Sequence, residues 1–136
     1  AGSETVKLKA LVDKFNLSEK VQFVGFVNSE ENAGYYSSAK FFVSLPESDA
    51  TAMSLLEAMY YKCIPILSDL PANNEWVKNG VNGVIVKNLN SEYISEALLL
   101  NAVEVGEENR TIILKSGTIE ISENKFQDVL IKACVK

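Results

Sequence analysis

An α/β fold with a doubly wound parallel sheet is the architecture that the order of apolar segments predicts. Four short runs are apolar almost throughout, at residues 21–27, 41–45, 64–67 and 84–86. Stretches with helical spacing separate these runs, and near-continuous apolar strands are typical of parallel sheets covered on both faces. The 136 residues, 47% of them hydrophobic, fit one globular domain and leave little room for two.

The first third of the chain alternates between helical and strand periods. Residues 4–15 place apolar side chains at helical intervals, and Asn16 marks the end of that helix. Residues 21–27 are β-branched and aromatic, which predicts a strand. Asn28, with acidic residues close behind it, is an N-cap signal for a short helix through Tyr36.

The middle of the chain supplies the other three strands. Residues 41–45 form the second apolar run, and a helix that starts at Thr51 or a neighbour follows it. Residues 64–67 are the third strand. Residues 84–86 are the fourth strand, because Asn-Gly turn signals precede them.

The last third of the chain is predicted to be helical. Asn90 or Ser91 caps a helix after the fourth strand. Residues 111–121 fit either a hairpin or two helical segments broken by Gly117. A hairpin is awkward in a parallel sheet, so we favour the helices. Residues 122–135 carry apolar side chains on one helical face and predict a final helix.

The composition excludes several classes of function. A formal net charge of −5 with a single arginine lacks the clustered basic face that nucleic acids or membrane surfaces require. Without histidine there is no Ser-His or Cys-His dyad and no imidazole ligand, so we expect no metal site. Cys63 and Cys134 lack C-x-x-C spacing, and we expect both to be reduced in a cytosolic protein. We see neither a signal peptide nor an apolar run of about 18 residues.

The loop after the second strand has features that suit a phosphorylated ligand. Open parallel sheets bind ligands at the carboxyl ends of their strands. Ala50, Thr51 and Ala52 are small enough for close backbone approach, and the free N–H groups at a helix start attract anions. Glu57 follows about one turn inside that helix. The alternative is that Asp49 or Thr51 only caps the helix and that Glu57 is an ordinary, satisfied carboxylate.

The stretch 41–75 matches a known pattern part by part. A strand ends in a Pro-Glu-Ser loop, and Asp49 and Glu57 follow with seven residues between them. The later parts are a Leu-Glu-Ala-Met helix, the strand 63–66, Ser68-Asp69, Glu75 and Asn82-Gly83. This order resembles the nucleotide-sugar-binding half of group 1 (family 4) glycosyltransferases with the GT-B fold. The resemblance covers about residues 4–100 and is strongest over residues 45–86.

The resemblance implies a role for each matching residue. Glu57 would hold the ribose hydroxyls of the donor nucleotide. Asp49, which is shorter than the family's glutamate, would contact the hydroxyls of the donor sugar; these two acids are the predicted catalytic residues. Val27 and Asn28 would lie near the nucleobase. Backbone amides would face the diphosphate from Thr51, Ala52, Met53 and Ser54.

The resemblance also implies what the whole protein is. Residues 1–136 would be the donor-binding C-terminal domain of a longer enzyme, a Rossmann-like half of GT-B that lacks its first strands and helix. The enzyme would be a retaining transferase of polysaccharide biosynthesis that moves a sugar from a nucleoside-diphosphate sugar to a glycan, lipid or other acceptor. The family's phosphate-binding Arg and Lys would precede Ala1, so the isolated segment would be inactive.

The implied partners are the nucleotide-sugar donor and an acceptor held by the missing N-terminal domain. The resemblance implies no cofactor beyond the donor substrate, no metal and no nucleic acid. The expected location is the cytoplasm, with the full-length protein able to sit at the inner face of a membrane through its missing parts.

Two alternatives stay open. A sugar-nucleotide epimerase of the same fold would share the phosphate site at the helix start, although the Asp49–Glu57 spacing favours the transferase. A non-catalytic interaction module could keep the fold and lose the ligand, because a fold by itself does not imply a function.

Overall fold

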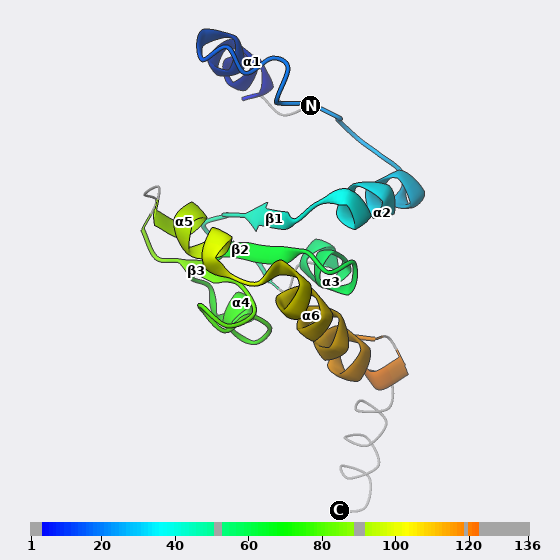
Figure 1. Cartoon of the computed structure of the whole chain (residues 1–136). Coiled ribbons are helices and arrows are strands. Elements are labelled where there is room, and N and C mark those ends of the chain that lie inside the picture. Colours follow the sequence, from blue (N-terminus) through cyan, green and yellow to red (C-terminus); the bar gives the residue numbers. More distant parts are fainter. Residues whose placement is uncertain (1–3, 51–52, 89–91, 119, 123–136) are drawn as a thin grey trace, which may run out of the picture. The chain divides into compact units, whose positions relative to one another are not determined.

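The computed structural model describes residues 4–50, 53–88, 92–118 and 120–122 (Figure 1). The chain forms two compact units, Ala1–Asn32 and Ala33–Lys136. The parallel sheet and most of the helices belong to the second unit. None of the helices in these ranges has the length and apolar character that a membrane span requires.

The first unit begins with α1, Thr5–Lys14, the helix that the spacing of its apolar residues predicts. Asn16 ends the helix with a left-handed backbone, φ 54°, which asparagine tolerates better than most residues. The amide of Leu17 then donates to the carbonyl of Val12 at 2.9 Å, a bond typical of helix C-termini. The predicted helix and its end are both confirmed.

The strand predicted at residues 21–27 does not form, so this prediction was wrong. Gly25 has φ 71°, which interrupts the extended backbone inside the run. A strand also needs a neighbour for its ladder hydrogen bonds, and the described part of the first unit contains no other extended element. The apolar side chains stay largely exposed, and Phe26 is 96% exposed.

α2, Ser29–Ser38, starts in the first unit and ends in the second. Asn28 and Glu31 form a reciprocal capping box at its start. The side chain of Asn28 accepts from the amide of Glu31 at 2.9 Å, and the carboxylate of Glu31 accepts from the amide of Asn28 at 3.0 Å. The predicted helix is confirmed, and it runs on past Tyr36.

The second unit is built on a three-stranded parallel sheet (Figure 1). Its strands are β1, Phe41–Ser44, β2, Ile64–Ser68, and β3, Val84–Val86, in the order β1-β2-β3. The register places Ile66 of β2 beside Val84 of β3. The predicted parallel α/β architecture is confirmed, and three of the expected apolar runs are strands in it.

β2 is the central strand although it contains a proline. The backbone amide of Ile64 donates to the carbonyl of Lys40, next to β1, at 2.9 Å. Backbone polar groups alternate in direction along a strand, so those of the next residue, Pro65, are directed toward β3. β3 pairs with β2 only from Ile66 onward, and Pro65 therefore removes no ladder bond. A Cβ added at Gly83 would lie 2.7 Å from the Pro65 carbonyl oxygen, so glycine is required for this close approach.

Alternate residues of β2 face different helices. Leu67 packs in one cluster with residues of α3, Met53–Tyr60, and α6, Ala102–Ser116. Ile66 packs in a second cluster with Ala97 of α5, Glu92–Leu99. The buried residues of the first cluster are Leu55, Leu56, Met59, Leu67, Val77, Ile85 and Ile113. Helices thus cover both faces of the sheet, as continuous apolar runs predict.

The helix α6 covers the first part of the region where the sequence left two alternatives, and residues 120–122 are helical again. The Asn101 side chain caps α6 by accepting from the amide of Val103 at 3.2 Å, and Gly117 ends it. The hairpin alternative for residues 111–121 is wrong, and the helix that ends at Gly117 is confirmed. The final helix predicted over residues 122–135 lies outside the described residues, apart from Ser122.

Candidate functional site

The carboxyl ends of the three strands meet at one edge of the sheet, because all three are parallel. The residues at this edge are the loop 45–50 after β1, Ser68 and Asp69 at the end of β2, and Lys87 and Asn88 after β3. We call these residues, together with the first turn of α3, the carboxyl-edge site. Ligands of open parallel sheets bind at such an edge.

α3 begins at this edge, because a parallel crossover must carry the chain back toward the start of the next strand. Its buried residues are Leu55, Leu56, Ala58 and Met59, and they fasten the helix to the sheet. Of the predicted backbone donors, Met53 is 62% exposed and Ser54 is half-buried, both in the first turn. Amides in a first turn lack intrahelical acceptors, so the start of α3 can receive an anionic group.

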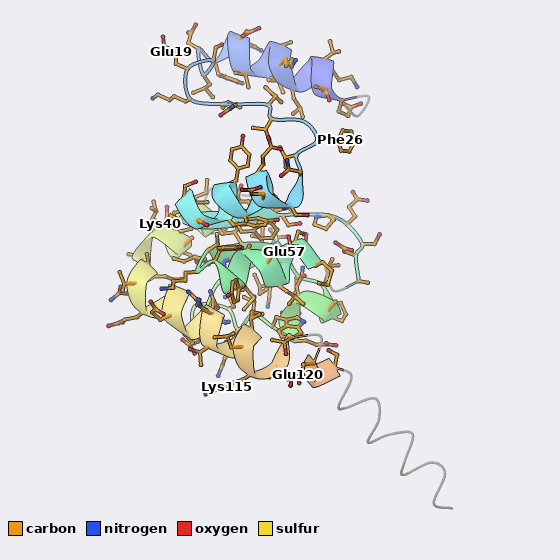
Figure 2. All side chains as sticks on the ribbon, turned by 90° about the vertical axis from the view of Figure 1, so that its right-hand side faces the viewer. Glu19, Phe26, Lys40, Glu57, Lys115 and Glu120 are labelled. Atoms are coloured by element: carbon orange, nitrogen blue, oxygen red, sulfur yellow. The ribbon has the colours of Figure 1, made fainter. Side chains whose placement is uncertain are left out.

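The two predicted catalytic acids lie on either side of the start of α3 along the chain. Asp49 is exposed in the loop. Glu57 is exposed on α3, about one turn inside the helix that carries its label in Figure 2. The oxygens of a carboxylate can accept hydrogen bonds from hydroxyl groups. Hydrogen-bond acceptors therefore lie close in sequence to the first-turn amides of α3.

The described structure does not test the other predicted site residues. Thr51 and Ala52 lie outside the described residues. Val27 and Asn28 belong to the first unit, where Val27 is half-buried and Asn28 caps α2. Their assignment to a nucleobase site stays a prediction.

Hydrogen bonds from β2 and the turn after it hold the loop, and the sequence reasoning assigned no role to these residues. The hydroxyl of Ser68 donates to the carbonyl of Pro46 at 2.6 Å. The amide group of Asn73 donates to the carbonyl of Ser68 at 2.9 Å, and Asn73 is 5% exposed. Asn73 lies on α4, Pro71–Asn74, a short helix that was not predicted; the proline at its start was the available signal.

A second feature of the edge is a cation that sequence reasoning also left without a role. Lys87 is exposed directly after β3, where it lines an open pocket of about 270 Å³ together with Asn88 and Tyr93. The signal that could have found it is its position immediately after a buried apolar run. Lys87 brings a positive charge to the carboxyl edge, two strands away from the loop.

The one cysteine in the described residues sits at the opposite edge of the sheet. Cys63 precedes β2, is fully buried, and its thiol donates to the carbonyl of Tyr36 at 3.3 Å. Burial raises the pKa of the Cys63 thiol, which keeps it protonated. Cys63 is therefore a core residue and no nucleophile. Within the ranges that the structure describes, no cluster of acidic and thiol side chains could hold a metal ion.

Comparison with protein families gives one match. The model of the family described as glycosyl transferases group 1 matches residues 1–101 of the chain. No curated protein matches the chain.

Solved structures resemble the chain in fold. The sucrose-phosphate synthase from Thermosynechococcus elongatus is 23% identical with a TM-score of 0.73, covering 97% of this chain and 35% of that structure. The C-terminal domain of a glycosyl transferase group 1 family protein from Francisella tularensis is 20% identical with a TM-score of 0.73, covering 88% and 66%. TarM is 22% identical with a TM-score of 0.75, covering 93% and 26%. The chain thus spans about a third of the first structure and a quarter of the third.

Proposed function

The chain belongs to the glycosyl transferases group 1 family, and we propose on this premise that it binds the sugar donor of such an enzyme. The observation that carries the proposal is the arrangement of Asp49 and Glu57. Asp49 precedes the start of α3 in the exposed loop segment 47–50, at the carboxyl edge of a parallel sheet, and Glu57 follows it as an exposed residue of α3. That combination offers amide donors for phosphates and carboxylate acceptors for hydroxyls in one place.

The donor we propose is a nucleoside-diphosphate sugar. Its diphosphate lies against the first-turn amides of α3, which include those of Met53 and Ser54. Glu57 accepts hydrogen bonds from the ribose hydroxyls, and Asp49 accepts them from hydroxyls of the sugar. This division of roles is supported by the order of residues along the connection, since the loop precedes the helix start and Glu57 follows it.

In the reaction we propose, the bond between the sugar's anomeric carbon and the diphosphate breaks. A bond from that carbon to an acceptor hydroxyl forms on the same face, which retains the configuration, and the hydroxyl proton passes to an oxygen of the departing diphosphate. Electrostatic support for the departing diphosphate is the main requirement of such a step. The start of α3 supplies part of that support, and the acceptor is a glycan, lipid or other hydroxyl compound bound elsewhere in the enzyme.

Glu57→Gln tests the proposal, because it keeps the side-chain shape and removes the charge. Loss of charge-assisted hydrogen bonds to ribose should weaken donor binding by about 1.5–3 kcal/mol. Donor affinity is measured by calorimetry in the enzyme that carries this chain, together with the melting temperature. Glu108→Gln, an exposed glutamate on α6, is the matched control and should leave affinity unchanged. Unchanged donor affinity in Glu57→Gln, with an unchanged melting temperature, would refute the ribose role.

A further inference from the structure

The loop that carries Asp49 is weakly held by packing. Residues 47–50 are all exposed, so contacts with the core do not decide their conformation. β1 anchors one end of the loop through its pairing with β2, and α3 anchors the other end through its buried residues. At the start of the loop Leu45 packs against the second core cluster, so a further contact is needed only from Pro46 onward.

Ser68 supplies that contact. Its hydroxyl donates to the carbonyl oxygen of Pro46 at 2.6 Å, across the gap between the carboxyl ends of β2 and β1. The proline ring already restricts rotation at Pro46, so fixing its carbonyl fixes the plane of the peptide that leads into Glu47. This hydrogen bond therefore restrains the path of the loop from Pro46 onward.

Ser68 is itself held in place from the other side. Its carbonyl accepts from the side chain of Asn73 at 2.9 Å. Asn73 is 5% exposed, and its backbone amide donates to the carbonyl of Leu70 at 3.0 Å, which holds the residue in α4. Beside it, the side chain of Asn74 donates to the carboxylate of Asp69 at 2.8 Å. These hydrogen bonds fix the turn after β2. The hydrogen bond from Ser68 to Pro46, which we call the clamp, can therefore restrain the loop.

We propose that Ser68 is a positioning residue that holds the Asp49 loop in its ligand-binding conformation. Ser68 touches no ligand in this role; it acts through Pro46. The part of the inference that concerns ligand binding rests on the proposed function, whereas the part that concerns the loop does not.

Three variants of Ser68 separate the hydroxyl from the shape of the side chain. Ser68→Ala removes the hydroxyl. Ser68→Thr and Ser68→Val have the same shape, and both suit the end of a strand, but only threonine keeps the donor. Ser37→Ala is the control, because it removes a hydroxyl that donates to a carbonyl at the same 2.6 Å in α2, away from the loop.

The first measurement is the amide order parameter of residues 47–50 by NMR relaxation on the chain as it stands. We expect rigid values near about 0.85 in the unsubstituted chain and in Ser68→Thr and Ser37→Ala, falling below about 0.6 in Ser68→Ala and Ser68→Val. Core chemical shifts that stay in place show that each variant is folded. Equal order parameters in Ser68→Thr and Ser68→Val would overturn the clamp.

The second measurement is an NMR titration of the same variants with UDP and with GDP. We expect Ser68→Ala and Ser68→Val to bind about threefold to tenfold more weakly, with Ser68→Thr unchanged. A loosened loop with unchanged affinity would overturn the positioning role. Absence of binding in the unsubstituted chain, beside a loop that loosens as expected, would count against the proposed function and leave the clamp supported.

Discussion

At the scale of single residues, the proposed role of Asp49 depends on whether its short side chain can reach the donor sugar. It is exposed in the loop and stands where the family motif has a longer glutamate. If it accepts from hydroxyls of the donor sugar, Asp49→Asn should lower turnover with the sugar donor more than affinity for the free nucleoside diphosphate. Steady-state kinetics of the enzyme and calorimetry with the diphosphate measure the two losses. Equal losses would instead indicate a capping or general electrostatic role.

Asn109 shows what a buried polar residue does in this chain. It is fully buried on α6, where its side chain donates to the carbonyls of Cys63 and Asn82 and accepts from the Asn82 side chain at 2.9 Å. Asn109→Ala leaves these partners unsatisfied, so the free energy of unfolding should fall by about 3–5 kcal/mol. Urea denaturation measures the fall.

Two further variants separate the buried network from the loss of volume. Asn109→Asp keeps the shape but turns a negatively charged oxygen toward two carbonyls, and it should destabilise at least as much as alanine. Glu108→Ala removes an exposed neighbour on the same helix and should change stability by less than about 0.5 kcal/mol. If Asn109→Asp proved as stable as the unsubstituted chain, the hydrogen-bond account of this residue would fail.

At the scale of whole elements, the packing of α6 against the turn between α3 and β2 depends on a glycine. A Cβ added at Gly106 would lie 2.8 Å from the carbonyl oxygen of Lys62. Lys62 belongs to a turn with φ 71°, which the backbone cannot easily shift. Gly106→Ala should therefore lower the free energy of unfolding by about 1–3 kcal/mol, despite the better helix propensity of alanine.

Gly34 provides the matched comparison within a helix. It lies in α2, and a Cβ added there would meet nothing within 4 Å. Gly34→Ala should therefore be neutral or stabilise the chain by up to about 1 kcal/mol. Thermal denaturation of the two variants side by side checks the pair. Equal effects of the two substitutions would show that α6 has room to move away from the turn.

At the scale of the whole molecule, charge sets how strongly this chain can hold a diphosphate. The formal net charge is −5, and no Lys or Arg occurs between Pro46 and Tyr60. A helix start offers only about half a positive charge to a dianionic group. Charge-assisted contacts from two Lys or Arg side chains would correspond to about 3–6 kcal/mol, or about two to four decades of affinity.

We therefore expect these 136 residues alone to bind nucleoside-diphosphate sugars at about millimolar dissociation constants and to transfer no sugar. Calorimetry at low ionic strength is the measurement, because added salt would screen the remaining attraction. Micromolar binding by this chain alone would show that its phosphate site is complete, and Lys87 would then be the first cation to examine.

Local signals in the sequence determined a large part of this structure. The capping box of Asn28 and Glu31, the ending of α1 at Asn16 and the break at Gly117 each involve residues a few positions apart. The parallel sheet also followed from the sequence, because strands buried on both faces must be apolar throughout. For the site, the sequence predicted only that Asp49 lies in the loop after a strand and Glu57 on the next helix, where the structure has them, since the two segments are neighbours in the chain.

Only the tertiary structure decided the features that depend on distant partners. Residues 21–27 have the composition of a strand, yet a strand exists only through hydrogen bonds to another chain segment, and composition does not record that segment. The hydrogen bond from Ser68 to Pro46 joins residues that are 22 positions apart. The hydrogen bonds of Asn109 join α6 to Asn82, which is 27 positions away, and to Cys63, which is 46 positions away. The sequence does not tell whether the side chain of a serine or an asparagine faces water or a buried carbonyl. The contribution of its hydrogen bonds to stability depends on the groups that folding brings beside it.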